Sequence, residues 1–320
     1  MAALLSPPMN GAYFNGLDQP NGLQTALDNI PGSVTTDYLL CSLNVTNTSP
    51  DINYGWNIPC VLASGGQITD WTKTHLCEVV RAGVQKGKCK RVWLVIGGAV
   101  DWVNNPQGTS AFTNIQNILY KGVNDPSYQT LQANFNAIIQ ALKSINGVES
   151  VGFDQDYEED GDLAPVVNNV SQFFISQFAS LITFCPYSEP AAWTKALTAV
   201  HSTWPGMVVG YNLQTYSGGG GNDPKDWVAS LKGTGVKDPD AFVWPIVSCI
   251  EGPTYTPDQV VAQLKNWVDQ STGQPTGFHS RGASLWASLG LKPQGSYTLT
   301  EYSKAIAQGI CVIERAATAP

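Results

Sequence analysis

The sequence predicts a single (β/α)8 barrel, the TIM-barrel fold, that spans residues 1–320 as one domain without a large insertion domain. Eight apolar, β-rich segments recur along the chain with helical patterns between them, and no linker rich in Pro, Gly or Ser divides them. Strands that alternate with helices form parallel sheets, and eight such units predict a closed barrel. An open doubly wound sheet is the main alternative. The eight segments are 11–17, 38–44, 91–97, 148–157, 181–187, 207–216, 241–250 and 281–289.

The helical segments between these strands are recognised by the spacing of their apolar residues. Segment 256–272 begins with Thr256, Pro257 and Asp258, a typical helix start, before apolar residues at 260, 261, 264 and 267. Because this helix fills most of the stretch between the last two strands, no room remains there for an additional α+β insertion. Segment 125–145 carries apolar side chains at helical spacing, namely Leu131, Phe135, Ile138, Ile139 and Leu142.

Composition argues against two classes of partner. Seventeen Lys and Arg residues against 25 Asp and Glu residues give a formal net charge of −8, so the surface does not attract nucleic acid. No apolar run approaches the length of a membrane span, so we expect no membrane partner. Charged residues make up only 13% of the chain, against about 25% in typical globular proteins. A surface of neutral polar and aromatic groups suits a carbohydrate.

The cysteines and histidines give no sign of a metal or nucleophile site. The seven cysteines lie far apart and form no CxxC pair, so we expect no zinc site, no redox dithiol and no cofactor. His75, His201 and His279 lie in no nucleophile signature and are expected to be structural or at the surface. The first residues lack the features of a signal peptide. The cellular compartment is not decided by the sequence, since a leader peptide can be removed from a chain.

The most informative stretch is the strand that ends in Asp154-Gln-Asp156-Tyr-Glu158. Side chains two residues apart on a strand share a face, so these three carboxylates are expected to line up about 6.6 Å apart on the side that points into the barrel. Repulsion and burial raise at least one carboxyl pKa, which a general acid requires. Glu158 is last on the strand and nearest the mouth, so it is the best-placed acid.

Two other interpretations of this acidic stretch are weaker. A solvated acidic loop has no reason to alternate with aromatic residues at 153 and 157. A calcium loop is imitated by the acidic positions 156, 158 and 160, but the twelfth position is Val167 instead of Glu, and no helix precedes the stretch.

The stretch 151–158 reads xGxDxDxE and resembles the DGxDxDxE motif on the fourth strand of glycoside hydrolase family 18, the chitinases and their relatives. Other segments resemble further signatures of this family in the right order, between residues 91 and 289. They are Leu94 to Gly98 for the third-strand SxGG, Cys185-Pro-Tyr for the fifth strand and Gln214-Thr-Tyr216 for the sixth-strand QxY of the class III, plant- and fungal-type branch, and Gly282 to Trp286 for the eighth-strand GxxxW.

The resemblance implies a retaining hydrolase for β-1,4-linked N-acetylglucosamine, in chitin or chito-oligosaccharides. In such enzymes the substrate's own 2-acetamido oxygen is the nucleophile. Glu158 would be the general acid, Asp156 would orient the acetamido N–H, and Tyr216 would hold the acetamido carbonyl oxygen. These three are the expected catalytic residues, and none of them requires a metal.

Supporting or substrate-binding roles are expected of seven more residues: Asp154, Gln214, Trp286, Gly97, Gly98, Asp101 and Trp102. Asp154 would hydrogen-bond Asp156, Gln214 would line the pocket, and Trp286 would form the floor under the sugar. Asp101 and Trp102 follow the third strand, where they would contact sugar at the rim of the cleft.

Two positions depart from the family pattern. Val151 replaces the first Asp, which we interpret as the loss of one member of an inner relay with Asp154, so an Asp restored at 151 is expected to shift the pH profile. Val95 replaces the Ser of the third-strand signature and makes the floor of the site more apolar. Both changes fall on supporting positions, which favours an active enzyme.

Two alternatives stay open at this point. One is an endo-β-N-acetylglucosaminidase that cuts the chitobiose core of N-glycans, because it shares the acetamido requirement. The other is a chitinase-like lectin with little or no turnover. In each case we expect a monomer whose partner is a polysaccharide or glycan that contains N-acetylglucosamine. A barrel without the insertion predicts an open groove and internal cleavage.

Overall fold

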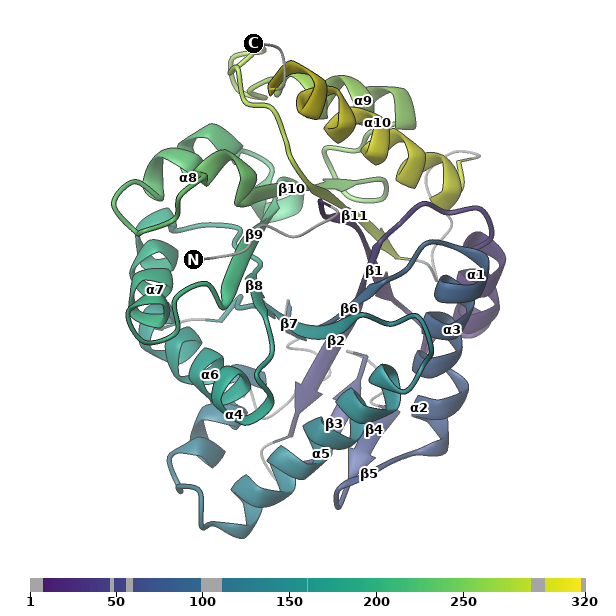
Figure 1. Ribbon diagram of the computed structural model, residues 1–320, viewed down its shortest axis with the longest axis vertical. Helices are drawn as coiled ribbons and strands as arrows, with labels where there is room; N and C mark the ends of the chain where they lie inside the picture. The colour runs from purple at the N-terminus through teal and green to yellow at the C-terminus, as the bar shows by residue number, and fades with distance from the viewer. Residues whose placement is uncertain are drawn as a thin grey trace.

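The computed structural model describes residues 8–46, 49–55, 60–98, 111–159, 161–288 and 297–317. Eight parallel strands form a closed barrel, in which the first strand pairs with both the last strand and the second. Figure 1 looks into this ring, with helices around its outside. In chain order the barrel strands are β1 (Asn10–Asn15), β2 (Asp37–Val45), β6 (Arg91–Gly97), β7 (Ser150–Asp156), β8 (Ile182–Phe184), β9 (Val208–Gln214), β10 (Val243–Ser248) and β11 (Ala283–Ser288). The predicted (β/α)8 barrel and all eight predicted strands are confirmed.

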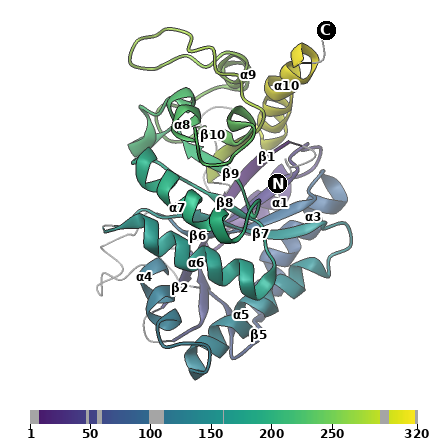
Figure 2. The same ribbon diagram turned by 60° about the vertical axis from the view of Figure 1, so that its left-hand side comes forward.

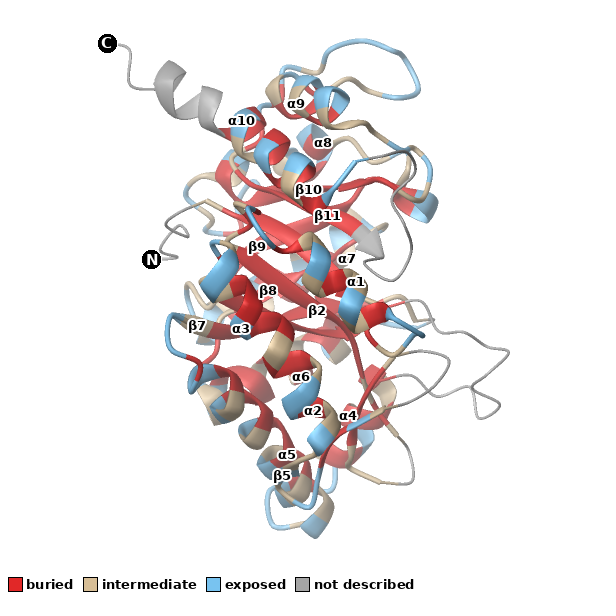
Figure 3. Cartoon of the chain, turned by 90° about the vertical axis from the view of Figure 1, so that its right-hand side faces the viewer, coloured by how far each residue is buried: buried red, intermediate tan, exposed pale blue. Residues whose placement is uncertain are grey.

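Helices cover the outer face of the barrel and bury one side against it (Figures 2 and 3). None of the helices among the described residues is long and apolar enough to span a membrane. Local signals fix several helix starts. Asp125 accepts a hydrogen bond from Ser127 N at 2.8 Å ahead of α5, and Thr256 and Gln259 form a capping box at α9. The helices are α1 (Gly22–Asn29), α2 (Asp70–Thr74), α3 (Leu76–Lys86), α4 (Ala111–Leu119), α5 (Pro126–Lys143), α6 (Leu163–Phe178), α7 (Pro190–Thr203), α8 (Pro224–Ser230), α9 (Pro257–Lys265) and α10 (Leu299–Ala317).

Helix α9 is shorter than the predicted segment 256–272, because it ends at Lys265. Beyond it, Trp267 N donates to Phe278 O at 3.1 Å, and Thr276 N donates to Trp267 O at 2.8 Å. Trp267 is fully buried. Its position therefore fits a helical spacing of apolar residues, although a hairpin-like loop carries it into the core.

An antiparallel extension follows β2 and was not predicted. It consists of β3 (Ile52–Tyr54), β4 (Cys60–Ser64) and β5 (Gln67–Ile68), paired in that order on β2. These strands are too short to show a clear pattern in the sequence. Gly65 and Gly66, at φ 55° and 81°, form the turn between β4 and β5, and such a Gly-Gly pair after an apolar run was the available signal. The extension packs on α5, where Asn134 Oδ1 accepts from Gly66 N at 2.7 Å.

The apolar side chains form two separate clusters. The larger lies between the strands and the helices, and the smaller fills the inside of the barrel. Glycines make room for the largest rings inside, because a Cβ on Gly152 would lie 2.6 Å from Trp93, and one on Gly210 would lie 2.3 Å from Trp244. The interior cluster consists of Met9, Tyr13, Leu39, Cys41, Trp93, Val95, Cys185, Val209, Tyr216, Trp244, Ile246 and Trp286.

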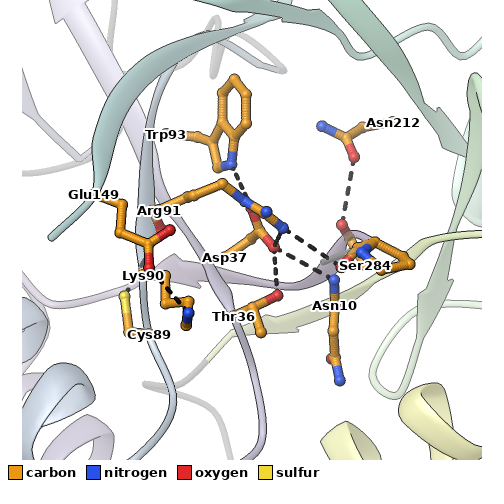
Figure 4. Close-up of polar contacts among 11 residues, drawn as sticks. Asn10, Thr36, Asp37, Cys89, Lys90, Arg91, Trp93, Glu149, Asn212 and Ser284 are labelled. Atoms are coloured by element: carbon orange, nitrogen blue, oxygen red, sulfur yellow. Dashed lines mark hydrogen bonds and ion pairs between the residues drawn. The ribbon is translucent and has the colours of Figure 1, made fainter. Parts of the chain in front are cut away.

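A buried ion pair joins the amino ends of neighbouring barrel strands (Figure 4). Asp37 at the start of β2 accepts two hydrogen bonds from the guanidinium of Arg91 at the start of β6, both at 2.6 Å. The indole of Trp93 donates to Asp37 at 2.9 Å and Thr36 Oγ1 donates at 2.6 Å. The side chains of Arg91 and Asp37 are 5% and 0% exposed. Both oxygens of the buried carboxylate therefore have protein donors, one of which brings a counter-charge.

The Asp37→Asn variant is expected to lower the free energy of unfolding by about 3–5 kcal/mol, because it leaves the buried guanidinium without its counter-charge. Urea unfolding measures the loss. The matched control is Glu149→Gln, which breaks the exposed pair between Lys90 and Glu149 and should cost less than about 1 kcal/mol. Equal losses in the two variants would contradict a stabilising role for the buried pair.

Candidate active site

The three carboxylates predicted on the fourth barrel strand lie at the carboxyl end of β7. Asp154 and Asp156 are buried within the strand, and Glu158 follows two residues after its last residue. Val151 and Phe153, on the alternate face, pack in the cluster between barrel and helices. The even-numbered side chains therefore point into the barrel.

Asp154 is a fully buried carboxylate that accepts hydrogen bonds from three other strands. Oδ2 accepts from Tyr13 Oη on β1 at 2.8 Å, and Oδ1 accepts from Thr183 Oγ1 on β8 at 2.6 Å and from Asn212 Nδ2 on β9 at 3.0 Å. Ser284 on β11 in turn donates to Asn212 Oδ1 at 3.4 Å. Burial raises the pKa of Asp154, and the three donors oppose that shift. All of these donors are neutral.

Gln214, the last residue of β9, links the other two carboxyl groups. Its Nε2 donates to Asp156 Oδ1 at 3.0 Å and to Glu158 Oε1 at 2.8 Å. The carboxyl groups of Asp156 and Glu158 also hydrogen-bond each other. Such a contact between two carboxyls needs a proton on one of them.

Both carboxyl groups of this pair favour the protonated form. Burial, followed by the charges of Glu158 and Asp154, raises the pKa of Asp156 well above its usual range. Burial, with a further contribution from the charge of Glu251, raises the pKa of Glu158. The pair therefore retains a proton at a pH at which ordinary carboxyls are ionised, and this is the property that a general acid needs.

Aromatic rings lie beside the carboxyl pair. Tyr216, two residues beyond β9, stacks on Trp286 of β11 with ring centroids 5.4 Å apart and planes 15° apart. Tyr13 meets the same indole edge-on at 5.4 Å. Trp286 Nε1 donates to Glu251 Oε1 at 3.2 Å. The site thus combines an acid pair with two stacked aromatic rings, both of them buried.

Gly97 and Gly98 support the backbone of the site. Gly98 N donates to Asp156 O at 2.7 Å, and a Cβ on Gly97 would lie 2.4 Å from the same oxygen. Gly97 also has a positive φ of 92°. A side chain at this position would push the end of β6 away from Asp156.

The structure corrects the interpretation of Val151. Its side chain packs in the cluster between barrel and helices, on the opposite face of β7 from Asp154, so an inner relay through position 151 is wrong. The relay assumed that positions 151 and 154 share a face of the strand. They are three residues apart, and an odd separation places two side chains on opposite faces. Val95 does lie inside the barrel and pairs in register with Asp154.

The remaining positions singled out in the sequence are two cleft-rim candidates and the three histidines. Asp101 and Trp102 lie outside the described residues. His75 lies between α2 and α3, His201 lies in α7, and the ring of His279 contacts the backbone oxygen of Lys265. Within the described residues, no group of His, Cys, Asp and Glu is arranged to hold a metal ion.

Sequence reasoning missed four residues of the site: Tyr13, Thr183, Asn212 and Glu251. The first three are polar groups within otherwise apolar strands, and Asn212 lies two residues before Gln214 on the same face of β9. This alternation was the available signal. Glu251 lies in a loop, and nothing in the sequence pointed to it.

The fold and the site together define a (β/α)8-barrel protein with a cluster of buried carboxyl groups at the carboxyl end of its strands. No family model matches the chain, and no curated protein does either. Among solved structures, the chain is similar to the catalytic domain of the hyperthermophilic chitinase from Pyrococcus furiosus, with a TM-score of 0.55 and 11% identity over 95% of this chain and 96% of that one.

Two further solved structures are similar to the chain. Catalytic-site mutants of active domain 2 of the thermostable P. furiosus chitinase, complexed with chito-oligosaccharides, match with a TM-score of 0.54 and 11% identity over 96% of this chain and 97% of that one. A xylanase and α-amylase inhibitor protein from Scadoxus multiflorus has a TM-score of 0.46 and 16% identity, over 93% and 98% of the two chains. At these identities the chitinase matches show a shared fold.

The Val151→Asp variant is expected to lower the free energy of unfolding by about 3 kcal/mol, because it buries a polar group in an apolar layer. The pH profile of any activity should keep its shape, since the new carboxyl faces away from Asp154. Urea unfolding and a pH profile check both expectations. A shifted profile with unchanged stability would contradict the orientation described for Val151.

The Glu158→Gln variant is expected to raise the free energy of unfolding near pH 7. Because the folded protein raises the pKa of Glu158, ionisation of this group weakens the folded state as pH rises above the unfolded-state value of about 4.3. Glutamine removes that cost and keeps an oxygen for Gln214. Urea unfolding should show the gain near pH 7 and no gain near pH 3, where the carboxyl is protonated in both states. An equal gain at both pH values would indicate a packing effect instead.

Proposed function

We propose that this chain is a retaining glycoside hydrolase that cleaves β-1,4 linkages between N-acetylglucosamine units of chitin or chito-oligosaccharides, with the 2-acetamido group of the substrate as nucleophile. The observation that carries the proposal is the Asp156–Glu158 pair, held by Gln214 beside the stacked rings of Tyr216 and Trp286. The resemblance to glycoside hydrolase family 18 rests on these same positions.

The contact between Asp156 and Glu158 favours a nucleophile supplied by the substrate. In most retaining glycosidases two carboxyls stand about 5–5.5 Å apart, and one of them attacks the sugar. Here the two carboxyls hydrogen-bond each other, so they pair with one another instead of facing a sugar from two sides. Asp156 is also almost fully buried. It is therefore suited to assist a nucleophile and poorly suited to be one.

In the proposed reaction, the proton that Asp156 and Glu158 share passes through Glu158 to the glycosidic oxygen as the bond to the anomeric carbon breaks, and Asp156 is left ionised. The acetamido carbonyl oxygen bonds to that carbon and forms an oxazolinium ion with retention. Asp156 accepts the acetamido N–H and offsets the developing positive charge, while the Tyr216 hydroxyl donates to the acetamido oxygen. Water then opens the ring and returns a proton to Glu158.

The aromatic surface supplies orientation in this proposal. The indole of Trp286 offers a stacking surface for the sugar in which the bond breaks. A fixed floor keeps the acetamido group above Asp156 and Tyr216, and such positioning accounts for a large part of the rate in intramolecular reactions. The chitinase from P. furiosus, which shares the fold, was crystallised with chito-oligosaccharides, and this is in line with the proposed substrate.

The wild type is expected to shorten chitohexaose, whereas Glu158→Gln should reduce turnover about 10³-fold through loss of the general acid. Mass spectrometry of the products checks this, with a parallel incubation of a high-mannose N-glycopeptide. The matched control is Glu189→Gln, which changes an exposed carboxylate in the loop between β8 and α7 and should leave turnover unchanged.

Two outcomes would replace the proposal. Release of glycan from the glycopeptide, with chitohexaose intact, would make the protein an endo-β-N-acetylglucosaminidase. Binding of chitohexaose without cleavage by the wild type would make it a chitinase-like lectin.

A further inference from the structure

Glu251 lies three residues beyond β10 and has no part in the proton transfers described above. Its carboxylate contacts elements on both sides. Oε1 accepts from the indole Nε1 of Trp286 on β11 at 3.2 Å, and Oε2 accepts from the hydroxyl of Ser217, which follows β9. One carboxylate therefore joins the ends of three consecutive barrel strands.

Ser217 has an unfavourable backbone conformation, which the contacts with Glu251 and its loop stabilise. Ser217 has a φ of 47°, in the left-handed region that residues other than glycine seldom adopt. Its backbone N also donates to Gly252 O at 2.7 Å. Ser217 directly follows Tyr216. The contacts with the loop after β10 therefore fix the backbone of Tyr216, while Trp286 fixes its ring.

Glu251 lies near the acidic side chains at the end of β7. Glu158 is close enough for the Glu251 charge to contribute, after burial, to its raised pKa, and Asp156 lies beyond Glu158 in the same cluster. Among the described residues, no lysine, arginine or histidine forms an ion pair with Glu251. The contacts of Glu251 are therefore hydrogen bonds to the Trp286 indole and the Ser217 hydroxyl.

We propose that Glu251 is a positioning residue for the reaction proposed above, on which this inference rests. Its carboxylate holds the Trp286 indole and the Ser217 turn, and thereby fixes the stacked Tyr216 and Trp286 rings over the Asp156–Glu158 pair. Glu251 acts through these rings, and the reacting atoms do not touch it.

The test compares Glu251→Ala, Glu251→Gln and the control Glu189→Gln. A glutamine at 251 keeps an oxygen for the indole and a polar group for Ser217, whereas alanine removes both. With chitohexaose, Glu251→Ala is expected to lower kcat about 10- to 100-fold through misplacement of the rings, with a smaller effect on KM. Glu251→Gln should restore most of kcat, and Glu189→Gln should match the wild type.

A second readout needs no substrate. The indole N–H resonance of Trp286, assigned in a ¹⁵N NMR spectrum with a Trp286→Phe variant, reports its hydrogen bond to Glu251. The resonance should move in Glu251→Ala and stay close to its wild-type position in Glu251→Gln. The pH profile gives a third readout, since loss of the Glu251 charge lowers the pKa of Glu158. The alkaline limb should therefore move to lower pH in both variants.

Two results would overturn the positioning role. One is a Glu251→Ala variant with wild-type kcat and an unmoved Trp286 resonance. The other is a Glu251→Gln variant as slow as Glu251→Ala. The rate would then depend on the charge of Glu251 and not on its hydrogen bonds to Trp286 and Ser217. If the wild type does not cleave chitohexaose, the proposed reaction fails, while the NMR comparison still decides separately whether Glu251 holds Trp286.

Discussion

The fully buried carboxylate of Asp154 is the constraint on which the carboxyl end of the barrel depends. It is a hydrogen-bond acceptor for side chains of β1, β8 and β9, and Asn212 extends the connection to β11. A buried carboxylate is tolerated only when its oxygens are satisfied, so these strands must end in register around it. The same requirement sets the height and direction of β7, and hence the places of Asp156 and Glu158. One side chain thus aligns the barrel strands and also positions the carboxyl pair.

The buried aspartates at the two ends of the barrel have different hydrogen-bond partners. At the amino end, the guanidinium of Arg91 pairs with Asp37 and offsets its charge. At the carboxyl end, Asp154 has only neutral donors, and burial raises its pKa. The first arrangement pairs the buried carboxylate with a counter-charge and so supports the fold, whereas in the second burial favours the protonated form. Such a division is expected where one end of a barrel maintains the fold and the other carries the chemistry.

The sequence predicted most of the fold because apolar strand segments and helical spacings are local patterns. It also predicted the carboxylates of β7, since their alternation with aromatic residues is visible in one strand. Tyr13, Thr183 and Asn212 were harder to find, because each is a single polar residue whose partner lies on another strand. Trp267 and Val151 were misinterpreted for a related reason. A spacing of apolar residues does not show whether a loop can bury the same side chain, and a motif does not show which face each position occupies.

The glycine and tryptophan pairs inside the barrel leave the buried carboxyls surrounded by aromatic rings. Trp93 against Gly152 and Trp244 against Gly210 fill the interior with rings, and Asp154 and Asp156 are both buried. Glu158 is only partly buried, so it is the most solvent-exposed of the three carboxyls. Its contact with Asp156 offers a route for proton exchange between solvent and the buried carboxyl. A ligand that covers Glu158 would slow this exchange and keep the proton in the pair.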